Sequence, residues 1–199
     1  MPITAVVLSA MWIFTALVLR IVIQVRRTGD TGLRAATGPR FSVAWWTAVT
    51  FVVAVVPVVT APVLLVAGTV DPLTDSVGLR WAGVGLAVIG IAGTFAAQLG
   101  MGASWRIGVD RGERTALVTS GAFGWARNPI FTAMIAAAVG VTATAPTALG
   151  VAGCVLLVAV IEAQVRLVEE PYLRAAHGAA YRAYTRSVGR FLPLVGRIG

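Results

Sequence analysis

Long apolar runs, separated by arginine-bearing segments, are the feature of this sequence that most constrains its fold. A helix needs about 20 mostly apolar residues to cross the hydrocarbon core of a bilayer. Three runs meet this length, over residues 3–25, 41–67 and 79–99. Only 12% of the 199 residues are charged, whereas soluble domains carry about 25%. The sequence therefore predicts an all-α integral membrane protein.

Two shorter apolar stretches follow at residues 129–145 and 147–161, and Pro146 divides them. A proline at this position favours a tight helical hairpin, whose second arm we expect to continue to about Val168. Each arm is short for a span, so the prediction is about five transmembrane helices, with four as the alternative.

The placement of arginine predicts the orientation of these helices. All sixteen basic residues are arginines, and all but Arg20 and Arg80 lie between the first two long runs, after the third, or in the tail. Cytoplasmic loops of membrane proteins carry an excess of basic residues. We therefore expect the N-terminus outside, the C-terminus in the cytoplasm, and polar residues 100–128 and 162–199 on one cytoplasmic face. The absence of lysine and the abundance of Ala, Gly and Val indicate a GC-rich coding sequence. This bias favours a bacterial protein, which we expect in the cytoplasmic membrane.

The same distribution argues against a nucleic-acid partner despite a net charge of +8, because the arginines lie beside apolar spans, where they meet lipid headgroups. The single cysteine, Cys154, excludes an internal disulfide and a thiolate zinc cluster, and we expect no metal. The single histidine, His177, is interpreted as a structural or interfacial residue.

The polar segment before the fourth apolar run carries donors suited to an anionic ligand. It reads Thr-Ser-Gly-Ala-Phe over residues 119–123, and Arg127-Asn128-Pro129 then opens the apolar run. Glycines and helix starts expose backbone N–H groups able to bind a carboxylate or the polar edge of a nucleoside. Arg127 can pair with a carboxylate through two hydrogen bonds. Alternatively, it only anchors its helix at the membrane interface.

The tail carries a pair of acids. Glu169 and Glu170 precede Pro171, at positions typical of the first turn of a helix. One face of this predicted helix carries Leu173, His177, Tyr181 and Tyr184. Arginines occupy another stripe, a pattern typical of an amphipathic helix on the membrane surface. That interpretation explains the arginines better than the acids, because carboxylates near anionic lipid need a cationic partner or a ligand.

Taken together and in order, these elements resemble the isoprenylcysteine carboxyl methyltransferase and phospholipid methyltransferase group. The matching residues are Arg127-Asn128-Pro129-Ile130-Phe131, Glu169-Glu170-x-x-Leu173, Gly178-x-x-Tyr181-x-x-Tyr184, Val188, Arg190 and Pro193. The resemblance covers roughly residues 98–194. Two residues depart from the family pattern: Asn128 stands where His is common, and Phe131 where Tyr is common. Since asparagine does not titrate, a histidine-based proton role is lacking at this position.

The resemblance implies an enzyme that takes a methyl group from S-adenosylmethionine, bound where the cytoplasmic ends of the last helices meet the C-terminal segment. We expect one domain, residues 1–199, with two N-terminal helices in residues 1–67 and the catalytic core in residues 79–194. One side of the cofactor pocket would be lined by Thr119, Gly121, Phe123, Arg127, Asn128 and Pro129. The other side would be lined by Glu169, Glu170, Leu173, Tyr181 and Tyr184.

The chemistry of the cofactor suggests roles for these residues. One of the two glutamates would hold the ammonium group, and backbone amides near Gly121 or Arg127 would hold the carboxylate. Tyr181 or Tyr184 would pack on the adenine. A carboxylate acceptor arrives ionised and would be oriented by Arg106 and Arg127, whereas an amine must first lose its proton to one of the glutamates.

The predicted acceptor is a lipid or small hydrophobic molecule, already nucleophilic or easily deprotonated, that enters from the bilayer between glycine-lined helices. The predicted catalytic residues are Arg106, Arg127, Glu169 and Glu170.

Two alternative functions remain open. The first is an NADPH-dependent membrane reductase of the sterol-reductase type, which shares a similar C-terminal pattern. Such reductases are generally longer, and this chain lacks an obvious further set of basic residues for the 2′-phosphate of NADPH. A small transporter could use Glu162 as a coupling acid, although an ion pair with Arg166 one turn later is the ordinary explanation.

Overall fold

The computed structural model describes residues 1–34, 39–108 and 116–198, and the regular structure within them is helical apart from two isolated β-bridges. The α-helices, in chain order, are α1 (Pro2–Ile13), α2 (Arg20–Thr28), α3 (Val43–Val66), α4 (Val77–Gly100), α5 (Pro129–Thr144), α6 (Ala148–Gln164) and α7 (Glu170–Ser187). Two π-helical segments, Phe14–Leu19 and Val165–Glu169, join α1 to α2 and α6 to α7. Short 3₁₀ turns occupy Gly102–Ser104 and Gly121–Gly124.

Joined in this way, the described residues form five helical rods. Four are long and apolar enough to cross a bilayer, namely Pro2–Thr28, Val43–Val66, Val77–Gly100 and Ala148–Ser187. The fifth, α5, has 16 residues, which makes it about 24 Å long against a hydrocarbon core of about 30 Å. The all-α prediction and the five helices are confirmed, while a fifth complete crossing stays a prediction.

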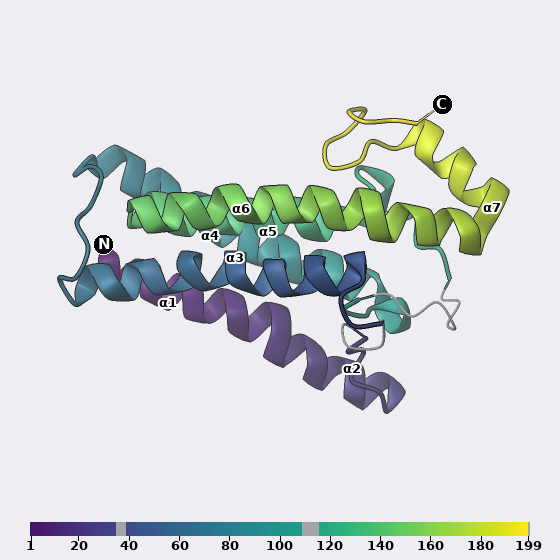
Figure 1. Ribbon diagram of the computed structural model, residues 1–199, viewed down its shortest axis with the longest axis horizontal. Helices are drawn as coiled ribbons and strands as arrows, with labels where there is room; N and C mark the ends of the chain where they lie inside the picture. The colour runs from purple at the N-terminus through teal and green to yellow at the C-terminus, as the bar shows by residue number, and fades with distance from the viewer. Residues whose placement is uncertain (35–38, 109–115, 199) are drawn as a thin grey trace.

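The rods lie side by side, with α6 packed on α3 and α4 packed on α5 (Figure 1). The end of α2, the segment before α5, and α7 all gather at one end of the bundle, which we call the arginine-rich end (Figure 1). The α3–α4 connection and the N-terminus lie at the other end. The described parts of the two largest polar segments thus lie at one end, as predicted, while the assignment of that end to the cytoplasm stays a prediction.

Glycines bring α4 and α5 into backbone contact. A Cβ atom built on Gly90 would lie 2.3 Å from the backbone nitrogen of Ala137, and one on Gly140 would lie 2.2 Å from that of Ala87. These distances leave no room for a side chain, and small residues of this kind let membrane helices approach closely. Gly90 and Gly140 therefore leave no gap between α4 and α5 for an acceptor, and entry of the acceptor from the bilayer stays a prediction.

The last two apolar runs form the predicted hairpin at Pro146, and the Thr147 hydroxyl accepts a hydrogen bond from the Gly150 backbone N–H at the start of α6. The predicted C-terminal helix is present as α7, but it is continuous with α6 and not a separate surface helix. The π-helical segment accounts for this continuity, because it shifts the hydrogen-bond pattern just before Pro171, which has no backbone N–H to donate.

A sharp bend divides α7 at Gly178, whose φ of 51° and ψ of −117° are accessible to glycine and strained for other residues. The second half of α7 turns away from the line of α6 (Figure 1). A single face carrying His177, Tyr181 and Tyr184 requires a straight helix. That predicted face is therefore interrupted at the bend.

Candidate functional site

Two segments far apart in the sequence meet at the arginine-rich end. The chain just before α5 runs beside the chain after α7, where Ala126 and Gly189 form a parallel β-bridge. The Arg127 backbone N–H donates to the Gly189 carbonyl oxygen at 2.8 Å. The backbone N–H and the side-chain Nδ2 of Asn128 both donate to the Arg190 carbonyl oxygen at 3.0 Å. The bridge joins the two motif segments into one unit, and it occupies the backbone N–H of Arg127, one of the amides expected near the cofactor carboxylate.

Glu170 lies at the centre of a buried charge cluster. The Nε of Arg190 donates to Oε1 at 2.7 Å and its Nη2 to Oε2 at 3.1 Å, while Nη2 of Arg127 lies 3.3 Å from Oε1. The Arg127 and Glu170 side chains are only 2% and 8% exposed. Two N–H···O bonds to one carboxylate are the strong form of this pairing, and they raise the pKa of Arg190.

Arg190 was expected only as a motif residue and was absent from the predicted site. The sequence signal that points to Arg190 is its place in the family pattern, a few residues after the tyrosine motif. What the sequence could not show is that a tight turn follows Gly189 and directs the Arg190 side chain back to α7. A Cβ atom on Gly189 would lie only 2.0 Å from the carbonyl oxygen of Leu192.

Arg127 carries buried donors that no described acceptor satisfies. Its Nη2 also donates to the Gly196 carbonyl oxygen at 2.8 Å, whereas Nε and Nη1 have no partner. A buried donor left unpaired costs about 1–3 kcal/mol, and more when the group is charged. Arg127 is therefore placed to receive an anionic group, and a role as an interface anchor alone does not account for its burial.

Glu169 has different neighbours from Glu170. Its Oε1 accepts a long hydrogen bond of 3.5 Å from Nε2 of Gln164, and Gln164 accepts one from the Thr47 hydroxyl near the start of α3. Within the described part of the chain, no arginine forms an ion pair with Glu169. The adjacent acids are thus separated, one into the arginine cluster and the other toward α3.

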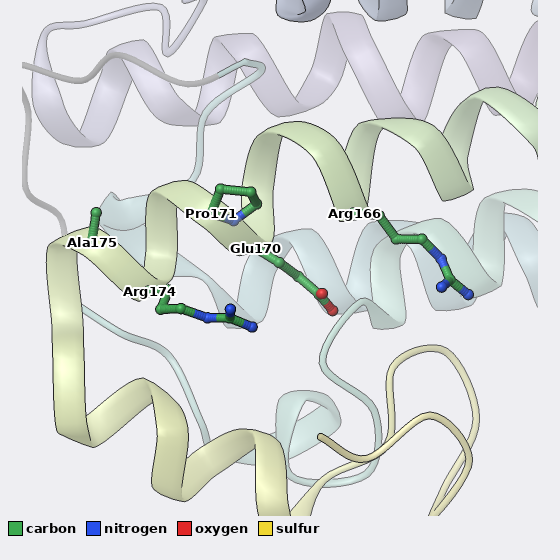
Figure 2. A pocket seen from close by; sticks show the side chains of 5 residues that line it. All are labelled: Arg166, Glu170, Pro171, Arg174 and Ala175. Carbon is green, nitrogen blue, oxygen red and sulfur yellow. The ribbon is translucent and has the colours of Figure 1, made fainter. Parts of the chain in front are cut away.

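A pocket of about 360 Å³ opens beside Glu170. It is lined by Arg166, Glu170, Pro171, Arg174 and Ala175. The side chains of Glu170 and Arg174 extend from neighbouring turns of the same helix (Figure 2). Arg166 pairs with Glu162 at 2.5 Å, as the ordinary explanation for Glu162 predicts.

The predicted aromatic residues form a small core of their own. Tyr181 is 2% exposed and Tyr184 is 8% exposed. They pack with Val188, Leu117 and Leu173. The Tyr184 hydroxyl donates to the Phe123 carbonyl oxygen at 2.5 Å, which ties the second half of α7 to the segment before α5. Stacking of either ring on an adenine stays a prediction.

The other predicted site residues lie around this unit. Thr119 is exposed just before the 3₁₀ turn, Gly121 is exposed as its first residue, and Pro129 begins α5. Arg106 approaches from the segment after α4, where its Nη2 donates to the Tyr172 hydroxyl at 2.9 Å. Its guanidinium carbon lies 5.7 Å from the centre of the Tyr172 ring. Arg106 therefore reaches α7 two residues beyond Glu170.

Comparison with known proteins identifies the family of the chain. The model of a phospholipid methyltransferase family matches residues 79–180, just over half of the chain. The chain belongs to the phospholipid methyltransferase family. Members of this family of membrane methyltransferases use S-adenosylmethionine as the methyl donor. The match ends inside α7, so the Arg190 segment lies beyond it.

The fold resembles that of a eukaryotic intramembrane Ras methyltransferase, the isoprenylcysteine carboxyl methyltransferase. The TM-score is 0.57 at 18% sequence identity, over 91% of this chain and 62% of that one. The chain thus spans less than two thirds of the length of that enzyme. The two proteins share the fold of a multi-pass integral membrane protein. No curated protein sequence matches the chain.

Proposed function

We propose that this protein transfers a methyl group from S-adenosylmethionine to a lipid-like or hydrophobic acceptor embedded in the membrane. The observation that carries the proposal is the buried cluster of Arg127, Glu170 and Arg190. It unites the two motif segments of the family next to a pocket at the arginine-rich end. Family membership supports this function over the NADPH-dependent reductase and the transporter.

The residues of the cluster fit the amino-acid part of the cofactor. The unpaired Nε and Nη1 of Arg127 suit its carboxylate. An ionised carboxyl group has about four lone-pair sites, and the three described contacts of Glu170 leave one for the ammonium group. When bound, the cofactor supplies an activated methyl group on a sulfonium. We include Thr119, Gly121, Phe123, Asn128, Pro129, Leu173, Tyr181 and Tyr184 in the proposed lining.

The protein's remaining tasks are to align the acceptor and to exclude water. A carboxylate acceptor needs no base, and Arg106, which bonds to Tyr172 on α7, is the proposed group that orients it. An amine acceptor needs a proton acceptor. The carboxylate of Glu170 is already held by two arginines, so Glu169, which has no arginine partner among the described residues, is better suited to that role.

The proposed placement follows the arginines. We assign the arginine-rich end to the cytoplasm of a bacterial cell, which puts the N-terminus outside. Residues 79–194 form the proposed catalytic core, and the two N-terminal rods complete the single domain. A soluble cofactor then reaches the site from the cytoplasm, and the hydrophobic acceptor reaches it from the bilayer.

Isothermal titration calorimetry of the detergent-purified protein with S-adenosylmethionine tests the proposal. Wild type is expected to bind, and Glu170→Gln and Arg127→Met are each expected to weaken binding about tenfold or more, since a charge-assisted hydrogen bond contributes about 1.5–3 kcal/mol. Glu162→Gln, an exposed acid on the same rod, is the matched control and should bind as wild type does. A folded, monodisperse wild type that binds NADPH instead of S-adenosylmethionine would overturn the proposal.

A further inference from the structure

The first helical rod carries a buried cation that the family match leaves without a role. Arg20 is 0% exposed and begins α2, directly after the π-helical segment. It lies outside residues 79–180. A buried charge in a membrane helix is costly and is usually functional. No carboxylate of the described chain pairs with Arg20, so its partners must be sought elsewhere.

The partners of Arg20 lie in the turn that follows α4. Its Nη2 donates to the Gly102 carbonyl oxygen at 2.8 Å, and its guanidinium carbon lies 4.4 Å from the centre of the Trp105 ring. One helical turn along, Nε2 of Gln24 donates to the Ala103 carbonyl oxygen at 3.2 Å. One face of the first rod thus holds residues 102–105.

The chain after α2 holds the same turn from another direction. Arg34 N–H donates to the Ile107 carbonyl oxygen at 2.7 Å, and Ile107 N–H donates to the Gly32 carbonyl oxygen at 2.8 Å. A Cβ atom on Gly32 would lie 3.1 Å from carbons of the Trp105 ring. Trp105 is therefore enclosed by Arg20 and Gly32, and it is only 3% exposed.

This enclosed tryptophan immediately precedes Arg106, which bonds to Tyr172 on α7. A continuous set of contacts therefore runs from Arg20 through the turn to the helix that carries Glu170. We propose that Arg20 is a positioning residue for the cofactor site: it fixes residues 102–106, and Arg106 in turn fixes the first half of α7. The inference rests on the proposed function, because the site it positions is the proposed cofactor site.

A purely structural role explains Arg20 poorly. Two of its nitrogens, Nε and Nη1, are buried without a partner, as is Oε1 of Gln24. Even a complete buried ion pair can often be replaced by apolar side chains of similar size without loss of stability, and Arg20 has no ionic partner among the described residues. A residue kept for stability alone would be better as methionine, whereas the planar guanidinium combines a hydrogen bond with stacking on a ring. That combination defines the position of the turn.

The test is a double-mutant cycle on the affinity for S-adenosylmethionine, measured by calorimetry alongside the melting temperature in detergent. Arg20→Met is expected to weaken binding about fivefold or more while the melting temperature stays level or rises. Arg27→Met, an exposed arginine on the same helix, should change neither quantity. In an Arg106→Gln background, Arg20→Met should weaken binding by less than about twofold, because residues that act through one another are not additive.

Three results would overturn the inference. The first is an Arg20→Met protein that binds as wild type does, and the second is full additivity of Arg20→Met with Arg106→Gln. If Arg20→Met fails to fold, Arg20→Lys replaces it in the test, because lysine keeps the charge but loses the planar stack on Trp105. Unchanged binding by Arg20→Lys is the third result. A wild type that does not bind S-adenosylmethionine fails the proposed function itself, and is thereby told apart from these results.

Discussion

Neighbouring residues of one motif acquire different properties from their surroundings. Glu170 has its carboxylate shared by two arginines, while Glu169 contacts only the amide of Gln164 among the described polar side chains. Only Glu170 lies against Arg127, whose unpaired nitrogens suit the cofactor carboxylate. The amino-acid part of the cofactor should therefore depend on one acid and not on the other.

We expect Glu169→Gln to leave the affinity for S-adenosylmethionine within about twofold of wild type, a difference of about 0.4 kcal/mol. The amide keeps the size of the side chain and its hydrogen bond with Gln164, and no arginine of the described chain loses a partner. Calorimetry with the wild-type protein and both glutamine variants provides the comparison. A loss at Glu169→Gln equal to that at Glu170→Gln would show that both acids contact the cofactor.

The Glu170–Arg190 pair should also matter for stability. Arg190→Met leaves a buried carboxylate with one weaker partner, and breaking a buried pair costs about 3–5 kcal/mol. Arg166→Met removes an exposed pair on the same rod, and such pairs contribute about 0–1 kcal/mol. Unfolding of both variants in detergent, followed by circular dichroism, measures the difference. Equal losses would mean that the Glu170 pair is solvated and not buried.

At the scale of helices, close packing of α4 on α5 depends on particular glycines. Gly90→Ala places a methyl group 2.3 Å from the Ala137 backbone nitrogen, and overpacking of this kind costs about 1–3 kcal/mol. Gly85→Ala on the same helix is the control, because no atom lies within 4 Å of its Cβ position. Melting temperatures in detergent should fall for Gly90→Ala and stay level for Gly85→Ala. A similar fall in both would argue against the described α4–α5 contact.

The bend in α7 makes a second prediction about an element. Gly178→Ala forces an L-residue into φ 51° and ψ −117°, at a cost of about 1–3 kcal/mol, although no atom lies within 4 Å of the Cβ position. Straightening the helix would pull Tyr184 from Phe123, so the affinity for S-adenosylmethionine should fall together with the melting temperature. Gly100→Ala, at an uncrowded helical glycine, is the control. Wild-type binding by Gly178→Ala would mean that the bend is not needed for the site.

At the scale of the whole molecule, the predictable features are those encoded locally. Apolar length alone located the long rods, because crossing a bilayer requires about 20 apolar residues in sequence, and the charge pattern placed the polar segments at one end. Two contacts join segments that are distant in the sequence: the β-bridge between Ala126 and Gly189, and the contact of Arg20 with the turn after α4. Hydrophobic periodicity reports only local structure, so it could not predict either contact. The family pattern included Arg190, but its place in the site depends on the turn after Gly189, which brings its side chain to Glu170.

The orientation of the whole molecule yields the last prediction. In a Cys154→Ser background, which leaves no other thiol, Asp75→Cys lies in the α3–α4 connection and Arg182→Cys lies in the exposed part of α7. The excess of arginine at the α7 end places that end in the cytoplasm. A membrane-impermeant maleimide added to intact cells should therefore label Asp75→Cys and should label Arg182→Cys only after permeabilisation. The reverse pattern would put the charge cluster outside the cell, away from a cytoplasmic supply of S-adenosylmethionine, and the proposed placement would be wrong.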